Sequence, residues 1–218
     1  DAFRTNTFML YNRGSNYLYF LWPALVFSSL QQLLLLALAV SFSREYAAGT
    51  FNQQGLLGYS HSPWVLIFVK WLPYFLMSFW TIGVYFGVSI CFRIPFPAHP
   101  LLLLSAQLLL VIGACLLGIT YSIIYPAPLK ASQLLMSIAS PAFTLSGFTW
   151  PSGQAPVILA ALGRIVPLTP YLQVMRMTLL QKATWQDVLP QLGHQVLLIA
   201  VYLTLAVVLL KSKIKKAL

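Results

Sequence analysis

Side chains that could do acid–base or metal chemistry are few in this chain and lie far apart. The three carboxylates are Asp1, Glu45 and Asp187, and only three histidines occur among 218 residues. Carboxylate catalysis needs paired groups near one substrate, and a metal site needs several ligands close together. Both cysteines, Cys91 and Cys115, fall in apolar runs and are interpreted as buried small hydrophobic residues. The residues therefore predict a non-catalytic chain with no metal or cofactor of its own, and an intramembrane enzyme is the weaker alternative.

The sequence also contains no element for nucleotide chemistry or nucleic-acid binding. The phosphate-binding motif Gly-x-x-x-x-Gly-Lys-Ser/Thr does not occur in it. The 13 lysines and arginines give a net charge of +10, but they lie at the ends of apolar runs. Nucleic-acid binding would instead place them on a polar surface interleaved with aromatic residues. We interpret these charges as marking membrane edges and expect no nucleic-acid partner.

The most informative polar stretch is the segment 43–57. Its apolar residues Phe51, Leu56 and Leu57 are too few for a membrane span, but they can line one face of a short helix along the membrane surface. Thr50 is a suitable N-cap, so helix is expected from residue 51 until the glycine at position 58. An ordinary interfacial connector is the alternative.

Polar residues inside apolar runs are candidates for a transport pathway. Gln31 and Gln32 lie in mid-span, where an amide is disfavoured without a partner, so at least one should face protein or a water-filled cavity. An interhelical hydrogen bond is the alternative to lining a pathway. A second set of small or polar residues could line a lateral opening or allow close helix packing. It comprises Ser137, Ser140, Pro141, Thr144, Ser146 and Gly147.

The elements that position these residues are membrane spans. The chain is 59% hydrophobic and 7% charged, with a mean hydropathy of +0.81. Runs of about 18 or more apolar residues can cross the hydrocarbon core as helices. We predict an all-α membrane protein with five spans, the fourth ending or kinking at Pro141. The predicted spans are residues 18–42, 65–92, 101–125, 134–148 and 188–210.

The segment between the last two spans is amphipathic and rich in proline. Pro156, Pro167, Pro170 and Pro190 divide it, which predicts two short helices at the membrane face, external or re-entrant. Broken helices at that depth need protein or water around them.

Orientation follows from the basic tail. Lysines cluster directly after the last span, which predicts a cytoplasmic C-terminus. Counting back through five spans places the segment 43–57 inside and the first residue outside. Because Asp1 is not a start methionine, we expect an additional anchor and an external region upstream, with residues 1–17 as the end of that region and residues 18–218 as the transmembrane domain. The lysines are Lys211, Lys213, Lys215 and Lys216.

In the segment 43–57 and in the stretches before its last span, the chain resembles type-2 ABC transporter permeases, the membrane subunits of ABC exporters. Their first cytoplasmic loop has an acidic residue, Gly-Thr, a short coupling helix and a Lys-x-x-Pro-Tyr-like entry to the next span. The family also has Gly-Phe-x-x-Pro and Pro-Leu-Thr-Tyr stretches before its last span, and this chain has similar ones. Tyr11-Asn12 before the first span is similar to the place where the family's chain enters the membrane from its external domain. The matching residues are Glu45, Gly49-Thr50, residues 51–57, Lys70-Trp71-Leu72-Pro73-Tyr74, Ser146-Gly147-Phe148-Thr149-Trp150-Pro151 with Pro156, and Pro167-Leu168-Thr169-Pro170-Tyr171. The chain departs from the family at Asn52, where an acidic residue is common, and at Gly58-Tyr59.

The resemblance implies a permease of an ATP-driven exporter in the bacterial inner membrane. A cytoplasmic ATPase would carry ATP and Mg²⁺ and would drive export of a hydrophobic or amphipathic substrate by two membrane subunits, identical or different. Arg44 and Glu45 would pair with ATPase charges or hold the loop, and a solvated local ion pair is the alternative. The residues implied in ATPase coupling are Arg44, Glu45, Gly49, Thr50, Phe51, Asn52, Leu56 and Leu57. An ATP-independent channel or a membrane assembly scaffold is the alternative function.

Overall fold

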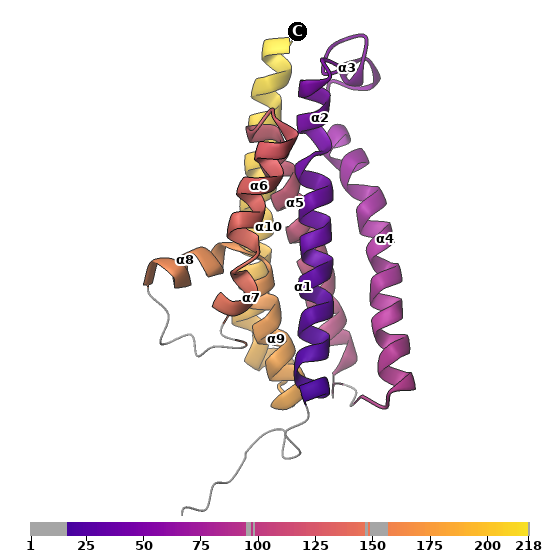
Figure 1. The fold of residues 1–218 in the computed structure, drawn as a ribbon, viewed down its shortest axis with the longest axis vertical. Helices are drawn as coiled ribbons and strands as arrows, with labels where there is room; N and C mark the ends of the chain where they lie inside the picture. The colour runs from indigo at the N-terminus through magenta and orange to yellow at the C-terminus, as the bar shows by residue number, and fades with distance from the viewer. Residues whose placement is uncertain (1–16, 95–96, 98, 147, 149–156, 218) are drawn as a thin grey trace, which may run out of the picture.

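The computed structural model describes residues 17–94, 97, 99–146, 148 and 157–217. These residues form helices α1 to α10, and no strand occurs in the described part (Figure 1). The predicted end of an external region, residues 1–17, lies almost entirely outside the described residues.

Long apolar helices dominate the fold. Four in the described chain are long and apolar enough to cross a membrane. The first consists of α1, Tyr17–Ala39, continued by α2, Ser41–Ala47, and the others are α4, Pro63–Cys91; α5, Pro100–Ile124; and α10, Trp185–Ala217. The predicted class, an all-α membrane protein, is confirmed.

The fourth predicted span is not one helix. The chain forms α6, Pro128–Ala139, and the single turn α7, Ala142–Leu145. Pro141 stands between them as the cap of α7, because proline has no N–H for a helix interior and its ring clashes with the preceding turn. The fourth predicted span, residues 134–148, is therefore divided between these helices, and the break at Pro141 is confirmed.

Two short helices precede the last span, as predicted. They are α8, Val157–Ile165, and α9, Leu168–Leu180. In Figure 1, α6 and α9 lie toward opposite ends of the bundle, with α7 and α8 between them.

The last helix is longer than the predicted span 188–210. Its start is capped by a side chain: the Asp187 carboxylate accepts hydrogen bonds from the backbone N–H and the hydroxyl of Thr184, both at 2.8 Å. This start lies upstream of Pro190, which is therefore contained in the first turns of the helix. The expectation that Pro190 bounds the preceding segment is wrong.

The centre of the bundle is α5, which contacts α1, α4, α6, α9 and α10. Gly118 of α5 allows α1 to pack closely against it, because a Cβ at this position would lie 2.9 Å from Leu38 Cβ of α1. By contrast, α4 lies at one side and has fewer contacts with the other helices than α1, α5 and α10 have (Figure 1). The core is thus built around α5, and α4 is its most weakly packed span.

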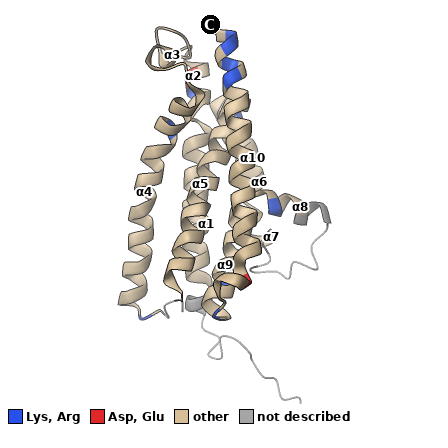
Figure 2. Cartoon of the chain, turned by 180° about the vertical axis from the view of Figure 1, so that it is seen from behind, with Lys and Arg blue, Asp and Glu red and all other residues tan. Residues whose placement is uncertain are grey.

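Both ends of the bundle have a distinct character. The α2–α4 connection with α3, Leu56–Tyr59, lies at the same end as the lysine-rich end of α10, which we call the basic end (Figure 2). The start of α1 and the end of α4 lie at the opposite end. The loop and the lysine tail therefore share one side, as the predicted span order requires.

Candidate functional site

The loop at the basic end begins at the C-terminus of α2, where the backbone conformation is fixed by a glycine and two hydrogen bonds. Gly49 has φ +68°, in the left-handed region that favours glycine. The Gly49 N–H donates to the Tyr46 carbonyl at 3.3 Å, and the Thr50 N–H donates to the Glu45 carbonyl at 3.0 Å. These two bonds form a Schellman motif, which ends α2 and turns the chain. The Gly-Thr pair therefore has a structural reason at this position.

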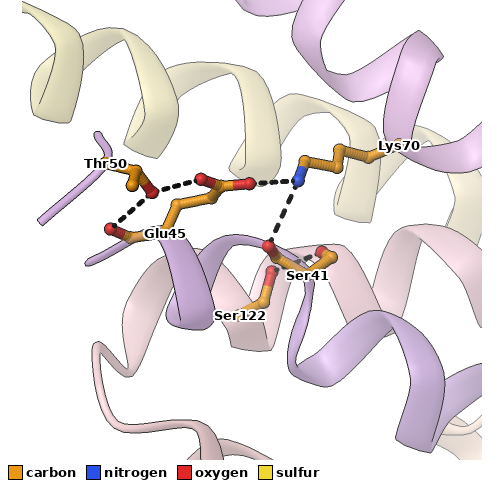
Figure 3. Close-up of polar contacts among 5 residues, drawn as sticks. All are labelled: Ser41, Glu45, Thr50, Lys70 and Ser122. Carbon is orange, nitrogen blue, oxygen red and sulfur yellow. Dashed lines mark hydrogen bonds and ion pairs between the residues drawn. The ribbon is translucent and has the colours of Figure 1, made fainter. Parts of the chain in front are cut away.

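The side chain of Glu45 joins the loop to two spans (Figure 3). Its Oε2 accepts a hydrogen bond from the Thr50 hydroxyl, and its Oε1 lies 2.7 Å from Lys70 Nζ of α4. Lys70 Nζ also lies 3.5 Å from the Ser41 carbonyl, and the Ser41 and Ser122 hydroxyls are 3.3 Å apart. Glu45 and Lys70 are partly buried, which reduces solvent screening of their attraction. We call Ser41, Glu45, Thr50 and Lys70 the Glu45 clasp.

Beyond the clasp, Asn52 organises a compact turn. Its Nδ2 donates to the Gly49 carbonyl at 2.9 Å, and its Oδ1 accepts from the Gly55 N–H at 2.8 Å. The Leu56 N–H then donates to the Thr50 carbonyl at 2.9 Å. At Gly55 the backbone passes so close that an added Cβ would lie 2.1 Å from the Thr50 oxygen. The turn therefore requires both an amide at position 52 and glycine at position 55.

Aromatic contacts fix the loop against the bundle. The Phe51 ring meets the Tyr46 ring edge-on at 4.8 Å, and Lys213 Nζ of α10 lies 5.4 Å from the centre of the Tyr46 ring. Leu57 is fully buried. The loop thus contacts α2, α4 and α10 through separate side chains.

The structure corrects several expectations about this loop. Helix occupies only Leu56–Tyr59, not residues 51–57, and Gly58 lies inside that turn. Thr50 does not cap a helix, because its hydroxyl is bonded to Glu45. In the described chain the salt bridge of Glu45 is with Lys70, and Arg44 is exposed. The alternative of a local Arg44–Glu45 ion pair is therefore not found among the described residues, where Glu45 holds the loop through the clasp.

Sequence reasoning missed two residues at this site. Lys70 was named as the start of the family-like entry to the second span, but its ammonium group is a clasp partner. Tyr59 ends α3 with 91% of its surface exposed. The sequence signal that could have found Lys70 is Glu45, the lone acidic residue of the loop. A carboxylate needs a positively charged or hydrogen-bonding partner when it is removed from water.

Asn52 gives a direct test of the turn. Aspartate at this position would still accept from the Gly55 N–H, but it could not donate to the Gly49 carbonyl and would set a charge against it. We expect Asn52→Asp to destabilise the loop by about 1 kcal/mol and to speed proteolysis there. Limited proteolysis of the purified protein measures this, with Gln53→Glu as the control because Gln53 is exposed. Equal cleavage of both variants would contradict this role of the amide.

Of the two mid-span glutamines, Gln31 is fully buried and Gln32 is half-buried. Neither amide atom of Gln31 has a hydrogen-bond partner among the described residues. One glutamine thus faces protein, as predicted, but the interhelical hydrogen bond proposed for it is not present.

Replacing Gln31 should reveal the cost of this unpaired amide. A buried polar group without a partner costs about 1–3 kcal/mol. We therefore expect Gln31→Leu, which keeps the volume and removes the polar atoms, to raise the unfolding temperature in detergent. Gln32→Leu is the matched control and should shift it less. A lower unfolding temperature for Gln31→Leu would show that the amide is hydrogen-bonded in the protein.

Most of the candidate residues around the break at Pro141 are exposed, Ser137 and Ser140 among them. Pro141 and Thr144 are exposed, so they are not used for close packing within the described chain, whereas Ser146 is buried. The Ser146 hydroxyl donates to the Phe143 carbonyl at 2.6 Å and accepts from the Phe148 N–H at 3.2 Å. Gly147 lies outside the described residues.

Comparison with known proteins assigns the chain to a family. The family model described as "ABC-2 family transporter protein" matches residues 1–208. Searches of curated proteins and of solved structures give no match. The match covers the long apolar helices and the clasped loop together. The chain is therefore a multi-pass membrane protein that belongs to the ABC-2 transporter family.

Proposed function

We propose that this chain is the permease subunit of an ATP-driven exporter and that a separate ATPase docks on the loop at the basic end. Family membership supports the class of protein. The ATPase would bind ATP and Mg²⁺, and the permease would act as a pair of identical or different subunits. The basic end would then be cytoplasmic, in agreement with the lysines at that end, in a bacterial inner membrane (Figure 2).

The observation that carries this proposal is the contrast between the tip of the loop and its stem. Tyr59 is 91% exposed at the tip, and Gln53 and Gln54 beside it are exposed too. Its stem is fixed by the Glu45 clasp and by buried Leu57. Exposed aromatic residues on a rigid support are favoured as anchors in protein interfaces.

Mechanical coupling follows from the same contacts. Movement of the tip would be transmitted to α2 and α1 through Glu45 and to α4 through Lys70. It would be transmitted to α10 through the Tyr46–Lys213 contact. Because α4 has the fewest contacts with the rest of the described chain among the long spans, it is the span that can move at the lowest energetic cost. ATP-driven movement of the loop would thereby change the packing of the spans and move a hydrophobic or amphipathic substrate outward.

Tyr59 tests the docking step. We expect Tyr59→Ala to weaken association with the ATPase by about 2 kcal/mol, as for an aromatic anchor, and to leave the permease folded because the side chain is exposed. The measurement is ATPase retention during purification together with substrate-stimulated turnover. Phe92→Ala, which removes an exposed aromatic side chain at the opposite end, is the control and should change neither. Equal effects of the two changes would contradict docking at the tip.

Reconstitution separates the exporter from its rival functions. An exporter complex in vesicles accumulates substrate only with hydrolysable ATP, whereas a channel passes ions without it. ATP-independent current through the purified chain would overturn the proposed function.

A further inference from the structure

A cavity near the opposite end of the bundle has a mixed polar and apolar lining. It lies between α7, α9 and the start of α10, with a volume of about 290 Å³. Its polar lining consists of Ser146, Gln173, Arg176, Gln181 and Gln191. Phe148 and Met177 contribute apolar surface. None of this surface belongs to the loop that couples to the ATPase.

The polar groups of the cavity define what it can bind. Gln191 Oε1 is buried and has no hydrogen-bond partner among the described residues, so it can accept a hydrogen bond from a ligand. The Ser146 hydroxyl is already bonded to the chain and offers little further capacity. Arg176 brings a positive charge and several N–H donors to the same cavity. A matching ligand therefore carries an anionic group together with a hydroxyl or amine.

The position of the cavity indicates the rest of the ligand. Gln181 directly follows the end of α9, and Gln191 lies in the second turn of α10. These helix ends are at the opposite end of the bundle, where the chain leaves the apolar zone (Figure 1). A volume of about 290 Å³ suits a headgroup rather than a whole lipid. The apolar side chains can accommodate the start of an alkyl chain.

We propose that this cavity binds the headgroup of an anionic amphiphile that also carries a hydrogen-bond donor, such as a phosphodiester bearing hydroxyl groups. Arg176 contacts the anionic group, and Gln191 Oε1 accepts a hydrogen bond from the hydroxyl or amine. The first methylene groups of the chain lie against Phe148 and Met177. This binding goes beyond the proposed function, because it requires neither ATP nor the ATPase.

Photolabelling of the full chain tests the site. The protein is placed in phosphatidylcholine nanodiscs that contain a photoactivatable phosphatidylglycerol, which has the phosphodiester and the hydroxyl groups. We expect labelled peptides from α9 and the start of α10, and competition by unlabelled phosphatidylglycerol. Arg176→Gln and Gln191→Leu should each weaken labelling about tenfold, and Arg176→Lys should weaken it less. Gln186→Leu, an exposed glutamine on the same helix outside the cavity, should have no effect.

Three results would overturn the proposal. The first is labelling spread over the spans and insensitive to Arg176→Gln and Gln191→Leu in variants whose elution and unfolding temperature match the parent protein. The second is equal competition by diacylglycerol, which has no anionic group. The third is equal competition by glycerol phosphate, which would show a small-anion site and not one for an amphiphile. Each comparison is made without ATP, so its outcome is independent of transport.

Discussion

Alanine at position 55 is expected to abolish ATP-driven transport while the bundle stays folded. Its Cβ would lie 2.1 Å from the Thr50 carbonyl oxygen and 2.9 Å from the carbonyl carbon. These are backbone atoms, held by the bond from the Leu56 N–H to the same oxygen, so no side chain can move aside. The strain is about 3 kcal/mol, the upper part of the range for overpacking. The turn should reopen and present Tyr59 wrongly to the ATPase.

Transport and ATPase retention in reconstituted vesicles measure this effect, which should exceed about tenfold. Gly83→Ala is the matched control, because a Cβ at Gly83 of α4 meets nothing within 4 Å. Alanine there should leave activity intact and slightly favour the helix. If Gly55→Ala transports at the parent rate, the compact turn is not needed for coupling.

The Glu45 clasp gives the second large effect. Lys70→Met leaves a partly buried carboxylate with Thr50 as its remaining side-chain partner, and Glu45→Gln removes the charge that holds Lys70. Each change should lower ATP-driven transport several-fold and uncouple it from ATP hydrolysis, because the loop loses its attachment to α4. The double variant should lose no more transport activity than either single variant.

A double-mutant cycle on transport rate and unfolding temperature measures that coupling. We expect an interaction energy of about 1 kcal/mol for stability. Lys130→Met is the control at the same end of the bundle, since Lys130 is exposed and lies 6.0 Å from the centre of the Tyr125 ring. Strict additivity of Glu45→Gln and Lys70→Met would show that the clasp does not connect the loop to α4.

The spans were predictable because hydrophobic length alone sets them. Three predicted spans match single helices, and the break at Pro141 follows from the missing N–H of proline. The start of α10 was placed after the charged residue Asp187, whereas the helix begins at Trp185 and the Asp187 carboxylate accepts a hydrogen bond from the Thr184 N–H just before it. That error came from an overlooked helix start and not from long-range packing.

The loop was predicted as a site, but its internal structure was not. Apolar spacing suggested a helix over residues 51–57, yet the chain forms a compact turn around Asn52 and Gly55, whose hydrogen bonds replace most of that helix. The Glu45–Lys70 contact joins residues 25 positions apart in the chain, and no short sequence window contains both. The unpaired amide of Gln31 likewise depends on which helices surround α1.

Site-specific photocrosslinking from the loop tests docking of an ATPase most directly. A photoreactive amino acid at position 59 or at position 92 places the same probe at the two ends of the chain in its native membrane. We expect position 59 to crosslink to a protein with a phosphate-binding Gly-x-x-x-x-Gly-Lys-Ser/Thr loop, identified by mass spectrometry, and position 92 not to. No such adduct from position 59, or equal adducts from both positions, would contradict it.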